Sequence, residues 1–197
     1  MYELIGTVRS RAFRVLWMLE ELGVPYTHTN VGPRSDVVLD LNPSGKIPVL
    51  REGDAVLTDS TAIMTYLGDK HHTLTFPAGT LDRARQDAMT QQVLDEVDAL
   101  LWTASRHSFI LPQEQRVEEI KDSLRWELSV NLDRLARQLT GPFLTGDQMT
   151  IPDIVLTHCL GWAAIAKFNP APPVLRDYFD RMRARPAYIK ARTDTSI

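Results

Sequence analysis

The residue types between Asn42 and Ile63 predict a site for an extended peptide. Ile47 precedes Pro48 within an extended run, and a proline has no N–H for a central position of a sheet. An Ile–Pro bond can also be cis at low cost, which would turn the backbone groups of Ile47 outward. Ser60 begins a helix, where free N–H groups favour an anion. The stretch could therefore bind a peptide backbone at Ile47 and a carboxylate at Ser60, although a hairpin followed by a capped helix is the alternative.

The motifs NPSGKIPVL and TDSTAI resemble the glutathione-binding half of the cytosolic glutathione transferases. The resemblance implies that Ile47, followed by a cis-proline at Pro48, pairs with the cysteinyl backbone of glutathione. It implies that the acidic–serine pair Asp59 and Ser60 holds the carboxylate of the γ-glutamyl residue, although the family more often has glutamate in place of Asp59. Lys46 could bind the glycyl carboxylate or lie in solvent.

A hydroxyl group at the start of the first helix is expected to activate the thiol of glutathione. A cysteine thiol has an unperturbed pKa of about 8.5, and a hydrogen-bond donor near the positive end of a helix stabilises the thiolate. Serine-type transferases have a catalytic serine ahead of a similar Arg–Val or Arg–Ala pair. The resemblance implies that Ser10, four residues before Arg14, donates this hydrogen bond. Ser10 could instead be only an N-cap, and Thr7 is the rival hydroxyl.

The loop that carries Ser10 favours a bacterial serine-type transferase of the theta or zeta kind. A tyrosine-type enzyme would need a tyrosine there, but the nearest, Tyr2, lies at the start of the first strand. The loop also has no cysteine for thiol–disulfide exchange, and the single cysteine, Cys159, is expected to be a buried, inert thiol. His71 and His72 would diverge on a helix, so no metal site is expected.

Hydrophobic patterning predicts the elements that position these residues. The order strand, helix, strand, helix, strand, strand, helix resembles a thioredoxin-like domain, and only helical periodicity follows the break at Pro77 and Gly79. The predicted fold is an α/β thioredoxin-like N-terminal domain at residues 1–75 plus an all-α helical C-terminal domain at residues 81–197, the glutathione transferase fold. The expected strands lie at 2–6, 25–31, 47–50 and 55–57, and the helices at 10–22, 35–41, 59–69, 82–106, 113–139 and within 172–191.

The second domain is predicted to supply the binding pocket for the other substrate. Thr150 and Asp153 have the spacing of a capping box, in its aspartate form, and resemble the family's box before a buried helix. In the family, the end of the first long helix borders the pocket for a small hydrophobic electrophile. Trp102, His107 and Phe109 lie there, and the alternative is that they are core or interface residues.

Composition excludes several other classes of partner. The net charge is −3, and neither half of the chain is basic, so nucleic acid and anionic membrane surfaces are not expected partners. One cysteine cannot form an intrachain disulfide. No apolar run approaches the roughly 20 residues that span a bilayer, and no secretory signal is recognised. A cytoplasmic location is the resulting expectation.

The predicted function is that of a glutathione transferase, which activates glutathione as its co-substrate for attack on a small hydrophobic electrophile. No metal is expected. The family resemblance implies a homodimer, in which the N-terminal domain of one subunit packs against the helical domain of the other, and a role in detoxification. Two alternatives stay open: a glutathione-dependent isomerase or peroxidase on the same scaffold, and a binding or regulatory protein of the same fold without turnover.

Overall fold

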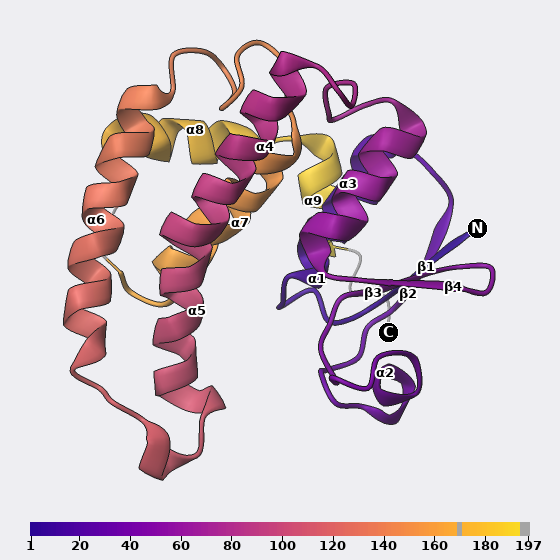
Figure 1. Cartoon of the computed structure of the whole chain (residues 1–197), viewed down its shortest axis with the longest axis horizontal. Coiled ribbons are helices and arrows are strands. Elements are labelled where there is room, and N and C mark those ends of the chain that lie inside the picture. The colour runs from indigo at the N-terminus through magenta and orange to yellow at the C-terminus, as the bar shows by residue number, and fades with distance from the viewer. Residues whose placement is uncertain (169–170, 194–197) are drawn as a thin grey trace. The chain divides into compact units, whose positions relative to one another are not determined.

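The computed structural model describes residues 1–168 and 171–193, which fall into two units (Figure 1). The first unit combines Met1–Ala78 with the segment that begins at Met182, and the second is Gly79–Arg181. The sequence led us to expect every helix after residue 81 in one helical domain. The structure instead places the last helix with the first unit, for reasons given below.

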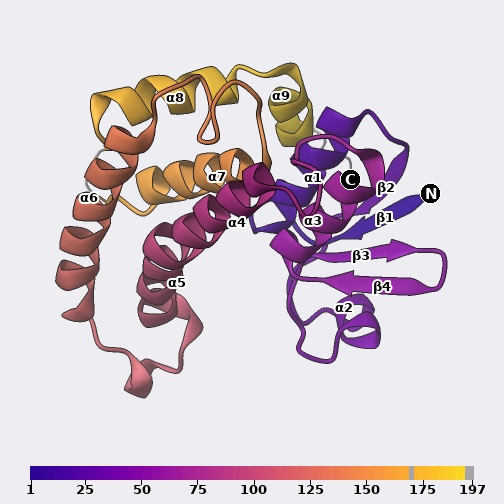
Figure 2. The same ribbon diagram turned by 45° about the horizontal axis from the view of Figure 1, so that its top comes forward.

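The first unit is built on a mixed four-stranded sheet in the order β2-β1-β3-β4. Strand β1 pairs in parallel with β2 and antiparallel with β3, and β3 pairs antiparallel with β4. Helices α1 and α3 cover one face of the sheet and α2 the other (Figures 1 and 2). The elements are β1 Tyr2–Ile5, α1 Ala12–Leu22, β2 Tyr26–Thr29, α2 Asp36–Leu41, β3 Val49–Glu52, β4 Ala55–Thr58 and α3 Ser60–His71.

Helix α1 is buried along most of its length because three elements cover it. The sheet and α3 contact it, and so does α9, Pro186–Thr193. The ring of Tyr188 lies edge-on to Phe13 and Trp17, with centroids 5.1 and 5.0 Å apart. Arg185 donates to both carboxylate oxygens of Glu21, at 2.6 and 2.8 Å. These contacts explain why the C-terminal helix belongs to the first unit.

The ion pair between Arg185 and Glu21 is expected to stabilise the first unit. Arg185→Ala is expected to lower the free energy of unfolding by about 1–2 kcal/mol, because it leaves a mostly buried carboxylate without its bidentate cation. Arg192→Ala, at an exposed arginine of α9, which follows Arg185 in the chain, is the control and should change stability by less than about 0.5 kcal/mol. Urea unfolding measures both, and equal effects would contradict a specific role for the pair.

The second unit consists of helices, but its first long helix is interrupted by one π-helical segment and ends in another. The predicted helix at 82–106 is divided into α4, a π-helical segment η1, α5 and a second π-helical segment η2. A π turn leaves a backbone carbonyl outside the regular ladder, and the buried Asn131 donates its amide to the carbonyl of Glu96 in η1 at 2.8 Å. The elements are α4 Leu81–Val93, η1 Leu94–Asp98, α5 Ala99–Ser105, η2 Arg106–Ile110, η3 Gln113–Gln115, α6 Ile120–Gln138, α7 Ile151–Ile165 and α8 Pro173–Arg183.

Helix α7 begins at the predicted capping box. Thr150 is the N-cap, and its N–H donates to Oδ2 of Asp153 at 2.8 Å. Most of the helix is buried, as expected for the central helix of this unit. Cys159 is buried within it, and its thiol lies 3.6 Å from a carboxylate oxygen of Asp98. Across residues 1–168 and 171–193, none of the helices combines the length and apolar character needed to cross a membrane.

Candidate active site

The strand register brings the predicted site residues to one end of the sheet. Ile5, the last residue of β1, pairs with Val49, the first residue of β3, and Val49 pairs with Thr58, the last residue of β4. The loop after β1, the residues before β3 and the start of α3 therefore emerge side by side. Ser10, Ile47 and Ser60 lie in these three segments. Tyr2 begins β1, so it lies at the opposite end of that strand, as the sequence suggested.

Ser10 lies in the turn before α1, not in the helix, which begins at Ala12 instead of the expected residue 10. Its hydroxyl donates to the carbonyl oxygen of Thr7 at 2.7 Å and accepts from the N–H of Ala12 at 3.1 Å. The N–H of Ser10 also donates to the Thr7 carbonyl, at 3.1 Å, which closes the turn. The oxygen of Ser10 thus caps the first turn, and its one proton must rotate away from Thr7 to reach a ligand.

Thr7 is the other hydroxyl of this loop. Its Oγ1 accepts a long hydrogen bond from the N–H of Arg9, at 3.4 Å. Its own proton is donated to no residue in the part of the chain that the structure describes. The two candidate hydroxyls therefore differ: the proton of Ser10 is in use within the loop, whereas that of Thr7 is not.

Ile47 presents its backbone at this end of the sheet. The Ile47–Pro48 peptide bond is cis, and β3 begins only at Val49. Among the described residues, neither the N–H nor the C=O of Ile47 has a hydrogen-bond partner. The side chain of Ile47 packs against the cluster that contains Ile5, Val38 and Val49. The residue is thus anchored by its side chain while both backbone groups are available to a ligand.

Asp59 has a structural role that the sequence analysis did not assign to it. It is the N-cap of α3, and its Oδ1 accepts from the N–H groups of Thr61 and Ala62 at 2.9 and 3.0 Å. Its φ of 70° lies in the left-handed region, which aspartate tolerates better than most residues. The sequence does contain a signal for this capping role, because aspartate is a common N-cap in the position just before a helix.

Ser60 and Lys46 are the other predicted binding residues. Ser60 is only 2% exposed, and its hydroxyl has no hydrogen-bond partner among residues 1–168 and 171–193. A nearly buried hydroxyl without a partner at the start of a helix is suited to an anion. Lys46 is exposed, and its ammonium forms no ion pair within the same residues.

The three residues predicted to line the electrophile pocket belong to the second unit. Trp102 lies in α5, and His107 and Phe109 lie in the π-helical segment η2. Trp102 and His107 are half-buried, whereas Phe109 is 65% exposed. Nδ1 of His107 accepts from the N–H of Val117 at 3.1 Å, so this nitrogen carries no proton. The described residues include no cluster of three or more side chains that could hold a metal ion.

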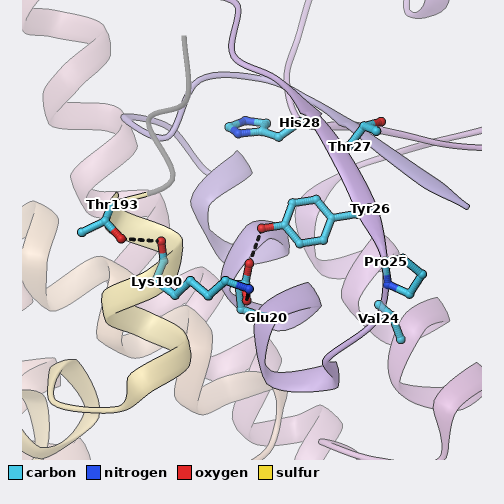
Figure 3. Close-up of a pocket in the computed structure, with 8 residues that line it drawn as sticks. All are labelled: Glu20, Val24, Pro25, Tyr26, Thr27, His28, Lys190 and Thr193. Carbon is cyan, nitrogen blue, oxygen red and sulfur yellow. Dashed lines mark hydrogen bonds and ion pairs between the residues drawn. The ribbon is translucent and has the colours of Figure 1, made fainter.

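The first unit also contains a cavity of about 610 Å³ (Figure 3). The carboxylate of Glu20, one of its lining residues, accepts from the hydroxyl of Tyr26 and pairs with the ammonium of Lys190 at 2.7 Å. Neither Ser10, Ile47 nor Ser60 lines it. The cavity is lined by α1, β2 and α9, through Glu20, Val24, Pro25, Tyr26, Thr27, His28, Lys190 and Thr193.

Comparisons with known proteins agree with the fold. The family model described as glutathione S-transferase, N-terminal domain, matches residues 9–70, and the one described as glutathione S-transferase, C-terminal domain, matches residues 69–186. The chain therefore belongs to the glutathione S-transferase family. This confirms the predicted family, its thioredoxin-like and helical domains, and the class of enzyme for which its relatives are named.

Individual relatives cover nearly the whole chain. The putative glutathione S-transferase alpha-2 of Dictyostelium discoideum is 26% identical over 191 residues, which cover 91% of this chain and 88% of that protein. The crystal structure of the theta class enzyme from Xanthomonas axonopodis pv. citri, with glutathione bound, is 26% identical with a TM-score of 0.79, and the match covers 96% of both chains. A glutathione transferase from Methylococcus capsulatus is 26% identical, with a TM-score of 0.81 and 98% coverage of both chains.

Proposed function

We propose that this protein binds glutathione along the end of the sheet and activates its thiol for attack on a small hydrophobic electrophile. The observation that carries the proposal is the free backbone of Ile47, next to the hydroxyl-bearing loop on one side and the start of α3 on the other. An extended peptide can pair with one exposed N–H and C=O, and a cysteinyl residue held there places its sulfur near the loop.

Each end of the tripeptide has a complementary partner in this arrangement. The γ-glutamyl carboxylate accepts from the N–H and hydroxyl of Ser60, with support from the positive end of α3. Because Oδ1 of Asp59 is occupied by helix N–H groups, its second oxygen is left for the positively charged amino group of the ligand. Lys46 is exposed and suited to the glycyl carboxylate at the other end.

Thiol activation is assigned to the Ser10 hydroxyl. At neutral pH only a few per cent of a thiol with a pKa of about 8.5 is ionised. When the proton of Ser10 rotates from the Thr7 carbonyl to the sulfur, the hydrogen bond favours the thiolate and lowers this pKa. The oxygen keeps its bond from Ala12 during this rotation because a hydroxyl has two acceptor lone pairs. Thr7 is the alternative donor.

The thiolate would then add to an electrophile held by Trp102, His107 and Phe109, and the protein would act as a homodimer. Conjugation is the default reaction. Isomerisation or peroxide reduction would use the same activated thiol, so these reactions are alternatives for the second step only. Neither changes the roles proposed for Ser10, Ile47 and Ser60.

The direct test is retention on immobilised glutathione, followed by assays with a panel of model electrophiles. Retention together with turnover is the expected result. Retention without turnover would replace the catalytic proposal with a binding role on the same fold. A protein that is not retained, and shows no binding in solution, would contradict the proposed site.

Ser60→Ala gives a sharper test of the binding pose. Loss of a hydroxyl that donates to a carboxylate is expected to raise the Kd for glutathione by about 10-fold. At saturating glutathione, kcat should stay within about twofold of the original, because this contact is made equally before and during reaction. Calorimetric titration and steady-state kinetics measure the two effects. Ser123→Ala, at an exposed serine of the second unit, is the control, and an unchanged Kd in Ser60→Ala would remove Ser60 from the site.

A further inference from the structure

Strand β2 holds Gly6, the residue after β1, through both of its backbone groups. The N–H of Gly6 donates to the carbonyl oxygen of Thr29 at 3.0 Å. The carbonyl oxygen of Gly6 lies 2.8 Å from Nε2 of His28. Because a carbonyl oxygen can only accept, the proton of the imidazole must lie on Nε2. This fixes both the donor in the contact and the orientation of the Gly6–Thr7 peptide.

The position of Gly6 matters because the two halves of the proposed site meet there. Its φ is 141°, and a Cβ atom at this position would lie 2.9 Å from Cβ of Ala12 and 3.0 Å from Cβ of Ile47. A side chain would therefore push apart the start of α1 and the residue proposed to bind the cysteinyl backbone. The close approach at Gly6 therefore keeps the start of α1 near Ile47.

The peptide that His28 holds leads directly into this loop. A peptide unit is planar, so fixing the carbonyl of Gly6 also fixes the N–H of Thr7 and the direction in which the chain leaves β1. The carbonyl of Thr7 in turn accepts from both the N–H and the hydroxyl of Ser10. The orientation set at Gly6 is thus passed through one residue to the oxygen of Ser10.

The same strand also holds the other end of α1. Figure 3 shows the side chains of Tyr26 and His28 on one side of β2 and that of Thr27 on the other, as the alternation of a strand requires. The hydroxyl of Tyr26 donates to Glu20, near the end of α1, while His28 holds the loop before that helix. Both side chains line the cavity of about 610 Å³. His28 is therefore a cavity-lining residue, as is Thr27, and it is not among the residues proposed to contact glutathione.

We propose that His28 is a positioning residue for thiol activation, which holds the Gly6 carbonyl so that the loop hydroxyls face a thiol bound at Ile47. This inference rests on the proposed function, because it assumes that the loop after β1 activates glutathione. It adds a residue that contacts neither substrate and that no motif in the sequence marked. His28 lies on an edge strand, and its contact is with a backbone atom 22 residues away.

The test compares two substitutions at His28 with a control on the same strand. His28→Phe keeps a ring of similar size but removes the donor, whereas His28→Gln keeps an N–H donor at similar reach. Thr27→Val alters the neighbouring residue on the opposite side of β2 and is the control. For each variant, kcat, KM for glutathione, the thermal midpoint and the pKa of the bound thiol are measured. The thiol pKa follows from the absorbance of the thiolate in a pH titration.

In His28→Phe, kcat is expected to fall about 5- to 10-fold and the pKa of the bound thiol to rise, with KM for glutathione changed by less than about threefold. His28→Gln should restore kcat and the thiol pKa to within about twofold and a few tenths of a unit of the original values. Wild-type kcat and thiol pKa in His28→Phe would overturn the proposal. Equal losses in both substitutions, together with an equal fall in the thermal midpoint, would also overturn it in favour of a purely structural role.

A measurement without glutathione separates this proposal from the proposed function. Hydrogen exchange of the amides of Ser10 and Ala12 reports how well the loop is held, whether or not the protein binds glutathione. Faster exchange at these two amides in His28→Phe, but not in His28→Gln or Thr27→Val, is expected and supports the positioning role. Unchanged exchange in His28→Phe would overturn it. If instead the original protein neither binds nor converts glutathione, the proposed function fails while the exchange result still stands.

Discussion

Replacing Ser10 by alanine is expected to lower kcat for glutathione conjugation by about 10- to 100-fold, with KM for glutathione changed by less than about threefold. The substitution removes the hydrogen bond that distinguishes the thiolate from the thiol, so the pKa of the bound thiol should return toward about 8.5. Binding of the tripeptide depends on Ile47 and Ser60, which are unchanged. Steady-state kinetics and a pH titration of the bound thiol provide the two measurements.

The matched variant is Thr7→Val, which removes the rival hydroxyl and keeps the shape of the side chain. If Ser10 is the donor, Thr7→Val should keep kcat within about twofold of the original. An unchanged rate in Ser10→Ala, with a loss in Thr7→Val, would transfer the role to Thr7. Ser10→Ala also deprives the N–H of Ala12 of its acceptor, at a cost of about 0.5–2 kcal/mol, so the thermal midpoint of each variant must be compared.

The sequence predicted the parts of the fold that depend on local residue types. Alternating apolar runs and turn residues gave all four strands to within a few residues, and the Thr150–Asp153 spacing gave the start of α7. The helix at Ser10 was placed two residues too early. A serine before an apolar helix is typical of an N-cap, but here a tight turn closed on the Thr7 carbonyl comes first. Hydrogen bonds of such a turn have no periodicity to reveal them.

Two kinds of feature could not be predicted from the sequence. One is a contact between residues far apart in the chain, and the other is a π-helical turn, which holds one more residue than an α-helical turn. The π-helical segments keep the apolar pattern of an ordinary helix, so nothing in the periodicity distinguishes them. The packing of α9 on α1 depends on Tyr188 and Arg185, which meet residues more than 160 positions earlier in the chain. His28 was missed for the same reason. Its partner is a backbone carbonyl, and such a contact leaves no mark on the residue types around Gly6.

Replacing Asp153 by alanine is expected to lower the free energy of unfolding by about 3–5 kcal/mol, the largest stability effect we expect in this chain. The carboxylate is buried and accepts from four donors. Oδ1 accepts from the N–H of Leu144 at 2.9 Å and the hydroxyl of Tyr178 at 2.8 Å. Oδ2 accepts from the N–H of Thr150 at 2.8 Å and from its hydroxyl at 3.3 Å. Alanine would leave two buried N–H groups without an acceptor, and would leave the Tyr178 hydroxyl only its longer contact, 3.4 Å, to the main-chain carbonyl of residue 153. It would also weaken the link between α7, α8 and the loop before α7.

Asp153→Asn should lower the free energy of unfolding by somewhat less, about 2–4 kcal/mol. Its carbonyl oxygen can still accept from one pair of donors, whereas its NH₂ group faces the other pair and cannot accept from them. Asp147→Ala, at an exposed aspartate of the loop before α7, is the control and should change stability by less than about 0.5 kcal/mol. Urea unfolding followed by circular dichroism measures each value. A loss of less than about 1 kcal/mol in Asp153→Ala would show that water replaces the carboxylate without cost.

The pH dependence of stability gives a second and independent readout of this carboxylate. Burial raises the pKa of the Asp153 carboxyl above its ordinary value, although the hydrogen bonds from Leu144, Thr150 and Tyr178 oppose that rise. The folded chain therefore holds this proton more tightly than the unfolded chain does. Its contribution to stability is fully present below the unfolded pKa, about 4, and is lost as the pH rises through the folded pKa.

The side-chain amide of asparagine does not ionise in this pH range. The stability of Asp153→Asn therefore has no contribution from titration at residue 153. The difference in unfolding free energy between the original protein and Asp153→Asn is therefore expected to shrink as the pH rises above about 4. A difference that stays constant over the same range would mean that the hydrogen bonds fully offset the effect of burial. In that case the four donors, which favour the charged carboxylate, would balance burial, and only a difference that grows as the pH rises would show that they outweigh it.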